Sequence, residues 1–198
     1  QTEYADALFK GSALSAAQRA AVAKKLSYFT GLSEDYLLKA NLRPRLSQFN
    51  VELLRSRGLT SGRIDARFTG YTADLLAENS QGDPQDPAVG GAYTALLNMY
   101  NHDELKFGRD KTYNNRANGA QWNWTRGGGF NRGGGFPSAP NSQNDLVQAM
   151  IANPKLLVQV ENGYDDMATP FFATEFTMTH LGLPAELQKN IKLNYYQS

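Results

Sequence analysis

The sequence predicts an α-rich α/β protein, mostly helical at first and ending in a short strand–helix–strand segment. Two observations carry this prediction. Across residues 1–60, apolar side chains recur at helical spacing between capping residues. Later, a branched apolar run at 156–161 precedes a proline-initiated helix and a second strand-like run at 191–196. We place a domain boundary between residues 142 and 143, where the pattern changes.

The composition excludes several classes of function. The 198 residues include 20 Lys plus Arg and 19 Asp plus Glu, a net charge of +1, so neither nucleic acid nor an anionic membrane is an expected partner. No apolar run is long enough to cross a bilayer. Cysteine is absent, which excludes disulfides and thiol catalysis, and His102 and His180 lack metal-ligand spacing. We expect no metal and no cofactor.

Three helices are expected before residue 60. Ser15 and Gln18 form a capping-box pattern ahead of a helix at 16–30, which Gly31 ends. Ser33 caps a short second helix, and a third runs from about Pro44 to Arg57. The side chains expected on their buried faces are Val22, Leu26, Phe29, Phe49, Leu53 and Leu54.

The segment 61–70 alternates apolar and charged residues, which predicts an extended strand with one wet face. That face carries Arg63, Asp65 and Arg67. Two interpretations stay open at this point. The charges form a solvated ladder of ion pairs, or they line an interface or a substrate pocket.

The middle of the chain is predicted as loop, interrupted by one helix. Residues 77–91 are polar and contain Pro and Gly, and a helix at 92–100 follows. The stretch 126-RGGGFNRGGGF-136 is a glycine-rich loop, which Trp122 and Trp124 are expected to anchor. It lacks the strand and helix of a phosphate-binding loop. Single-stranded nucleic-acid binding through its Arg and Phe residues is a third alternative function.

The last part of the chain predicts a right-handed βαβ unit. Its elements are a helix at 144–154, a strand at 156–161, a helix at 170–182, a short helix that Pro184 begins, and a strand at 191–196. Asp165 and Asp166 follow the first strand. Functional groups gather at the carboxyl ends of strands in open α/β sheets, so both acids are candidate site residues. In the alternative, purely structural interpretation, Asp166 caps the next helix, although Thr169 directly precedes that helix and is the nearer candidate for its cap.

The run VENGYDDMATPFFATEFTMTHLGLP at 160–184 resembles the late part of the serine carboxypeptidase family, particularly its bacterial members. The segments EYADALFKG, NLRPRLSQFN and GRIDARFTGY are similar to the helical cap of these α/β-hydrolases. The resemblance covers nearly the whole chain and is strongest at 155–184 and weakest at 75–142. It implies a helical cap at 1–142, with the glycine-rich loop inside it, followed at 143–198 by the last βαβ part of the hydrolase core.

The resemblance also implies an activity. In this family a Gly-x-x-Asp step carries the acid of a Ser-His-Asp triad, which assigns that role to Asp166 in Gly163–Asp166. The reaction would be acyl transfer that releases C-terminal residues from peptides. No Gly-x-Ser-x-Gly pattern occurs in the sequence, and the family's histidine would follow a segment like 192–198. His180 is not expected to replace it, because it lies on a helix that leads away from the strand end.

We therefore expect a fragment of a serine carboxypeptidase-like hydrolase that is inactive alone. Its partners would be a peptide substrate and the rest of the α/β-hydrolase core, and its free strand edges also allow pairing with a second copy. Arg63, Asp65 and Arg67 are candidates for the substrate-facing lining of the cap. The resemblance suggests an exported protein. The alternative is a non-catalytic interaction module, in which the cap helices and the glycine-rich loop bind a partner and Asp166 has no catalytic role.

Overall fold

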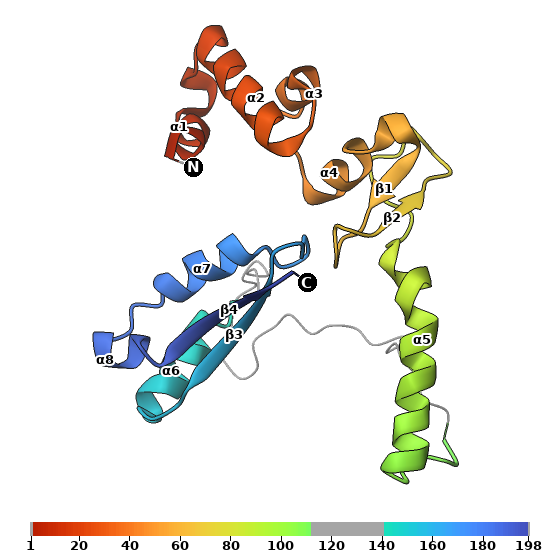
Figure 1. Cartoon of the computed structure of the whole chain (residues 1–198). Coiled ribbons are helices and arrows are strands. Elements are labelled where there is room, and N and C mark those ends of the chain that lie inside the picture. The colour runs from red at the N-terminus through yellow and green to blue at the C-terminus, as the bar shows by residue number, and fades with distance from the viewer. Residues whose placement is uncertain (1, 112–140, 198) are drawn as a thin grey trace, which may run out of the picture. The chain divides into compact units, whose positions relative to one another are not determined.

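The computed structural model describes residues 2–111 and 141–197, which contain helices and two small sheets (Figure 1). The predicted α-rich α/β class is confirmed at that level. The glycine-rich loop predicted at 126–136, Trp122 and Trp124 lie outside the described residues. The chain divides into two compact units, Gln1–Gly90 with Asp165–Ala168, and Gly91–Tyr164 with Thr169–Ser198. The boundary expected between residues 142 and 143 stays a prediction.

The first unit begins with helices and continues into a small antiparallel sheet. The helices are α1 (Thr2–Lys10), α2 (Ala16–Thr30), α3 (Glu34–Lys39) and α4 (Leu46–Glu52), with short 3-10 helices at Gly11–Ala13 and Arg55–Arg57. The strands β1 (Leu59–Ser61) and β2 (Thr69–Tyr71) pair with Thr60 opposite Gly70. Helix α5 (Gln85–Met99) follows and ends in a π-helical turn at Tyr100–Glu104.

Local capping sets the bounds of α2 and α3 as the sequence predicted. The Ser15 backbone N–H donates to the Gln18 side chain at 3.0 Å, and the Gln18 backbone N–H donates to Ser15 Oγ at 3.2 Å. Gly31 then ends α2 at a φ of 76°, a conformation that glycine adopts without strain. Ser33 accepts the Tyr36 backbone N–H at 3.1 Å and so begins α3.

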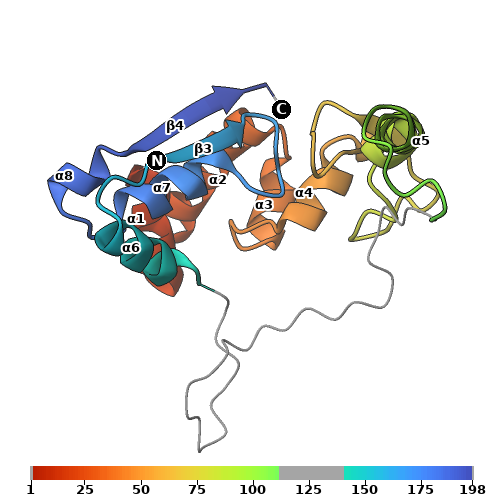
Figure 2. The ribbon, with the colours of Figure 1, turned by 90° about the horizontal axis from the view of Figure 1, so that it is seen from below.

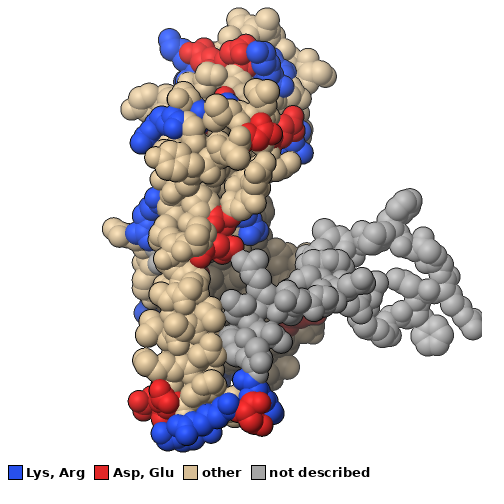
Figure 3. All heavy atoms as spheres, turned by 90° about the vertical axis from the view of Figure 1, so that its right-hand side faces the viewer, with Lys and Arg blue, Asp and Glu red and all other residues tan. Residues whose placement is uncertain are grey.

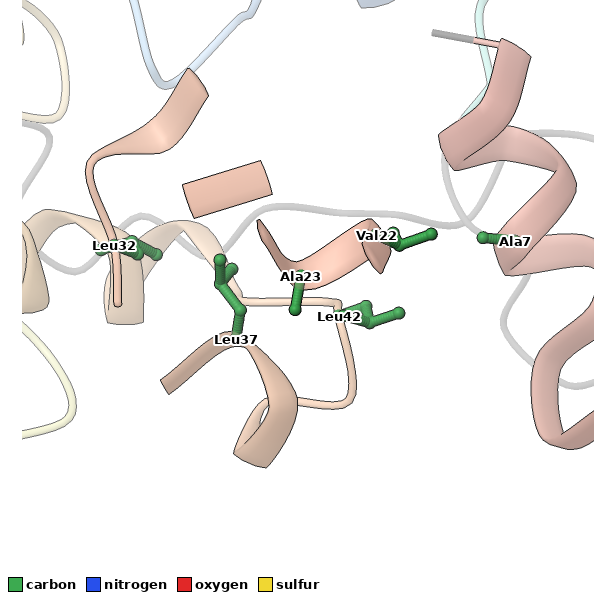
Figure 4. Close-up of a cluster of buried hydrophobic side chains, with 6 residues drawn as sticks. All are labelled: Ala7, Val22, Ala23, Leu32, Leu37 and Leu42. Atoms are coloured by element: carbon green, nitrogen blue, oxygen red, sulfur yellow. The ribbon is translucent and has the colours of Figure 1, made fainter. Parts of the chain in front are cut away.

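A cluster of buried apolar side chains joins α1, α2 and α3 (Figure 4). It consists of Ala7, Val22, Ala23, Leu32, Leu37 and Leu42. Leu26, Phe49 and Leu53 are partly buried against it, in agreement with the sequence. The expected burial of Phe29 is wrong, because this side chain is 80% exposed and packs edge-to-face against Tyr28. Helical spacing shows which face of α2 is apolar, but it does not show how far along that face the neighbouring elements cover it.

Two predicted boundaries in the first ninety residues are also wrong. The third helix was expected to reach Arg57, but α4 ends at Glu52 and the chain continues as a 3-10 turn that Gly58 ends. Helix α5 begins at Gln85 rather than near residue 92. Asp83 accepts the Gln85 backbone N–H at 3.1 Å, and Pro87 lies in the first turn, so ordinary helix-start chemistry overrides the polar composition.

The side of α5 carries a stripe of exposed apolar residues. None of its residues is buried, and Tyr93, Leu96, Leu97 and Tyr100 recur at helical spacing with their side chains exposed. Figure 3 shows mostly uncharged side chains along this helix, with both signs of charge near its C-terminal end. Within the described residues, no helix is long and apolar enough to span a membrane.

The second unit contains the predicted strand–helix–strand segment. Its elements are α6 (Gln143–Ala152), β3 (Val158–Gly163), α7 (Phe171–Thr179), α8 (Ala185–Gln188) and β4 (Ile191–Tyr196). Strands β3 and β4 pair in parallel, with Val158 opposite Ile191, and α7 runs alongside them (Figures 1 and 2). The predicted parallel pairing across a helical connection is confirmed.

Strand β3 is not buried on both faces, although its apolar composition is typical of a buried parallel strand. Leu157, just before β3, is 77% exposed, and Gln159 and Glu161 lie exposed on one face. That face is polar, because Asn194 of β4 donates to Glu161 at 3.0 Å. Within the described residues β3 has β4 as its one strand neighbour, so its side chains alternate between a half-buried and a wet face.

Leu37→Ala should destabilise the first unit strongly. Leu37 is completely buried in the cluster, so the substitution removes apolar contacts and leaves a cavity, at a cost of about 2–5 kcal/mol. Its neighbour Leu38 is 36% exposed, and Leu38→Ala is the matched control on the same helix. Urea unfolding followed through NMR signals of α2 measures both. Equal effects of the two substitutions would contradict the assigned core.

Candidate functional site

The segment Tyr164–Pro170, at the carboxyl end of β3, carries both acids singled out in the sequence. Asp166 is partly buried, and its Oδ1 accepts the Ala168 backbone N–H at 2.7 Å. A carboxylate bonded to the backbone two residues on forms an Asx turn, which restricts its rotation. Helix α7 begins after this turn with Pro170 in the N-cap position, so the expectation of Thr169 as its cap is wrong. The structure thus presents Asp166 in a fixed turn between a strand and a helix.

Both neighbours of Asp166 are hydrogen-bonded to the loop between β1 and β2. The Ala66 backbone N–H donates to the Asp165 carbonyl at 2.9 Å. The Met167 backbone N–H donates to the Arg63 carbonyl at 3.0 Å. These contacts explain why Asp165–Ala168 groups with the first unit. Asp166 therefore lies between two points at which the chain is held.

The loop Gly62–Phe68 differs from its prediction in both shape and burial. A continuous extended segment was expected at 61–70, but the chain turns between β1 and β2. Asp65, expected on the wet face, is 3% exposed, whereas Ile64, expected on the buried face, is 44% exposed. Charged and apolar residues do alternate in this segment. Because the chain turns, however, Asp65 lies inside and Ile64 lies outside, the reverse of what a strand would give. The solvated ladder is therefore wrong for Asp65.

Arg67 neutralises the buried Asp65 carboxylate. Its backbone N–H donates to Asp65 Oδ1 at 2.9 Å, and its Nη2 donates to Oδ2 at 2.6 Å. Nε also donates to Oδ1 at 2.9 Å, which completes a bidentate pair. Hydrogen bonding to Asp65 raises the pKa of the Arg67 guanidinium above its ordinary value. A buried carboxylate is tolerated when charge and donors are supplied in this way.

Arg67 also contacts the acidic segment. Its Nε lies 3.6 Å from Asp165 Oδ2, an ionic contact rather than a hydrogen bond. Asp165 is half-buried, and among the described residues its carboxylate forms this ion pair with Arg67. Arg67 consequently joins the Gly62–Phe68 loop to the residue next to Asp166.

Two residues that the sequence analysis missed shape this loop. A Cβ on Gly62 would lie 2.2 Å from the Asp65 carbonyl oxygen, so no other residue fits there without movement. Asn50 of α4 is buried and donates from Nδ2 to the Gly62 carbonyl at 3.0 Å. The available signal was the position of Asn50 beside the buried Val51, where a polar side chain needs a partner.

A surface pocket of about 620 Å³ adjoins the other side of the loop. Arg63 lines it, whereas Asp65 and Arg67 do not, so the three candidate substrate-facing residues do not share one surface. Asp83 holds the part of the pocket that Arg63 and Ile64 form, because its Oδ2 accepts the backbone N–H groups of both residues, each at 3.1 Å. The lining residues are Arg45, Leu46, Ser47, Asn50, Ser61, Arg63, Ile64, Asn79, Ser80, Gly82, Asp83 and Asp86.

In the second unit, an aromatic group flanks the two ends of the acidic segment. Tyr164 stacks on Tyr195 with ring centroids 5.5 Å apart and meets Phe171 edge-to-face at 5.3 Å. The Tyr195 hydroxyl donates to Glu175 at 2.5 Å. This hydrogen bond is the largest cause that raises the pKa of Tyr195 to about 12. The aromatic group thus holds Tyr164, the first residue of the segment, and Phe171, the residue just after it.

Neither histidine takes part in this arrangement among the described residues. His180 follows α7, stacks on Phe176 at 3.9 Å, and its Nδ1 lies 2.7 Å from the Phe176 carbonyl oxygen. His102 lies in the turn after α5, where its carbonyl accepts from Arg109 Nε at 2.8 Å. Across residues 2–111 and 141–197, no three His, Cys, Asp or Glu side chains gather as a metal site would require.

No protein-family model, curated protein or solved structure matches this chain. A carboxylate fixed at the end of a parallel strand can accept a hydrogen bond from an imidazole and stabilise its charged form. It can also simply support the local turn. Whether Asp166 orients an imidazole or only supports its turn distinguishes a catalytic role from a structural one.

Glu175→Gln should lower the pKa of Tyr195 from about 12 toward 10.0, because the negative partner that disfavours the phenolate is removed. Since the folded-state pKa is the higher one, this contact contributes fully to stability below about pH 10 and is lost as the pH rises through about 12. An NMR titration of the Tyr195 ring carbons measures the shift. Glu186→Gln, at an exposed acid of α8, is the control, and an unchanged Tyr195 in Glu175→Gln would refute the assignment.

Proposed function

We propose that this chain is part of a serine carboxypeptidase-like hydrolase, with Asp166 as the acid of a Ser-His-Asp triad. The observation that carries the proposal is the placement of this one carboxylate. It follows a parallel strand in a Gly-x-x-Asp step and is held in an Asx turn ahead of a helix. In this proposal residues 1–142 contribute a helical cap, and β3, α7 and β4 belong to the α/β-hydrolase core at 143–198.

The reaction would be acyl transfer on a peptide. A serine attacks the carbonyl of the last peptide bond while a histidine takes its proton, and the histidine then protonates the leaving amine. Asp166 would accept a hydrogen bond from the imidazole, fix its tautomer and stabilise the imidazolium. The sequence has no Gly-x-Ser-x-Gly pattern, so the nucleophile would come from elsewhere in a longer polypeptide, as would the histidine.

The pocket at Arg63 gives the proposed cap a surface for substrate. Its Arg45 side chain is paired with Glu78 at 3.0 Å, whereas the Arg63 guanidinium has no ion-pair partner among the described residues. An unpaired guanidinium beside a pocket suits an anionic or carbonyl-rich part of a peptide. Arg67 forms ion pairs with Asp65 and Asp165, and neither Asp65 nor Arg67 is part of this proposed lining.

A non-catalytic interaction module is the second candidate, favoured by the apolar stripe on α5. Four large apolar side chains lie exposed at helical spacing there, which is typical of a helix that packs against another surface. Under this candidate Asp166 supports its turn and has no chemical role. Nucleic-acid binding through 126–136 remains a prediction on residues outside those described.

In the longer polypeptide that this proposal implies, Asp166→Asn should lower peptidase kcat by about 10⁴-fold, because an amide cannot hold the imidazole in the productive tautomer. Release of C-terminal residues from a peptide measures the loss. Glu186→Gln exchanges an exposed carboxylate for an amide in the same unit and should retain activity. The 198-residue chain alone should be inactive. Full activity of Asp166→Asn would exclude the triad role and leave the interaction module.

A further inference from the structure

We propose that the loop Gly62–Phe68 is a clamp that positions Asp166, and that the Asp65–Arg67 ion pair keeps this clamp in its holding shape. The inference that the clamp positions a catalytic acid rests on the proposed function. The contacts that form the clamp are independent of that function. Arg67 and Asp65 are positioning residues here, since neither would touch a substrate.

The clamp acts through the backbone on both sides of Asp166. One bond holds the Asp165 carbonyl at 2.9 Å and the other holds the Met167 N–H at 3.0 Å. Both partners, Ala66 and Arg63, belong to the same loop. Asp166 is the single residue between the two held groups. Its backbone is therefore fixed by the loop, and its carboxylate is fixed by the bond from Ala168.

The ion pair determines where those backbone groups lie. Asp65 accepts from the backbone and the guanidinium of Arg67, and its carbonyl accepts the Phe68 N–H at 3.2 Å. Gly62 donates to the Phe68 carbonyl at 2.8 Å, which closes the loop at its base. Without the guanidinium, Asp65 would keep a buried charge with fewer donors, and the loop would open to hydrate it. Ala66 lies between the two paired residues and would move with them.

Arg67 adds a direct link to the held segment. The same Nε that donates to Asp65 lies 3.6 Å from the Asp165 carboxylate. A lysine could supply the charge for Asp165 but not the planar fork that Asp65 binds. The geometry therefore requires arginine, and a lysine should restore only part of the effect.

Amide hydrogen exchange of the 198-residue chain tests the clamp without any assay of activity. In Arg67→Gln, the amides of Ala66 and Met167 should exchange about 5- to 30-fold faster, as expected when a local contact is weakened. Amides of α2 should be unchanged. Arg57→Gln, at an exposed arginine of the same unit, is the control, and Arg67→Lys should give an intermediate rate.

A second pair of variants disturbs the loop without changing its charge. Gly62→Ala places a Cβ against the Asp65 carbonyl and should also speed exchange at Ala66 and Met167. Gly82→Ala has open space around its Cβ and should not. Unchanged exchange at both amides in Arg67→Gln would overturn the clamp. Acceleration that extends equally through α2 would overturn it too, because the pair would then support the whole unit.

The effect on the acid itself has a spectroscopic readout. The carboxyl carbon signal of Asp166, identified by its loss in Asp166→Asn, should shift in Arg67→Gln but not in Arg57→Gln. In the longer polypeptide, Arg67→Gln should lower kcat with little change in KM. Faster exchange with an unmoved Asp166 signal and unchanged kcat would overturn the positioning role. If Asp166→Asn were fully active while exchange and signal responded, the triad would fail and the clamp would stand.

Discussion

The pairing of the buried Asp65 carboxylate with Arg67 is the interaction on which this region depends. An ionised carboxylate that is 3% exposed is stable only when cation and donors surround it, and a single arginine supplies both. This requirement forces a turn where the sequence pattern predicted a strand. As a result, the Ala66 N–H and the Arg63 carbonyl point toward the segment that contains Asp166 and form hydrogen bonds with it.

Asp166 is surrounded by restraints of different physical kinds. Hydrogen bonds from the Gly62–Phe68 loop hold its backbone neighbours, whereas stacked rings at Tyr164, Phe171 and Tyr195 hold the ends of the segment. Its own carboxylate is bonded to Ala168. An acid that merely faced solvent would need none of this. Restraint of this density is what a catalytic acid needs, since a small change in its direction misplaces the group that it orients.

The two candidate functions explain different features of the molecule. A triad acid explains the restraint around Asp166 and leaves the α5 stripe as a packing surface for the rest of an enzyme. An interaction module explains the stripe and leaves the restraint as local support of a turn. The pocket at Arg63 fits either, because an arginine with no ionic partner among the described residues can bind a peptide or a protein surface. The behaviour of Asp166 decides between them.

The sequence by itself determined the elements whose signals are local. Ser15, Gln18 and Gly31 set the bounds of α2 because their hydrogen bonds and backbone angles involve residues within one turn. The same holds for Ser33. The order strand, helix, strand could also be recognised in the sequence, although the parallel pairing of β3 with β4 joins residues as distant as Val158 and Ile191. The placement of Asp166 at the end of β3 followed from that pairing.

Only the tertiary structure decided how the loop and the acid meet. The alternation at 61–70 was compatible with a strand until the burial of Asp65 required Arg67 to fold back onto it. The sequence did not show which groups Asn50 and Gly62 contact, because both contacts are with backbone atoms that the fold brings close. The contact between Arg63–Arg67 and Asp165–Met167 joins residues far apart in the chain, and such pairings depend on the packing of the whole unit rather than on any one segment.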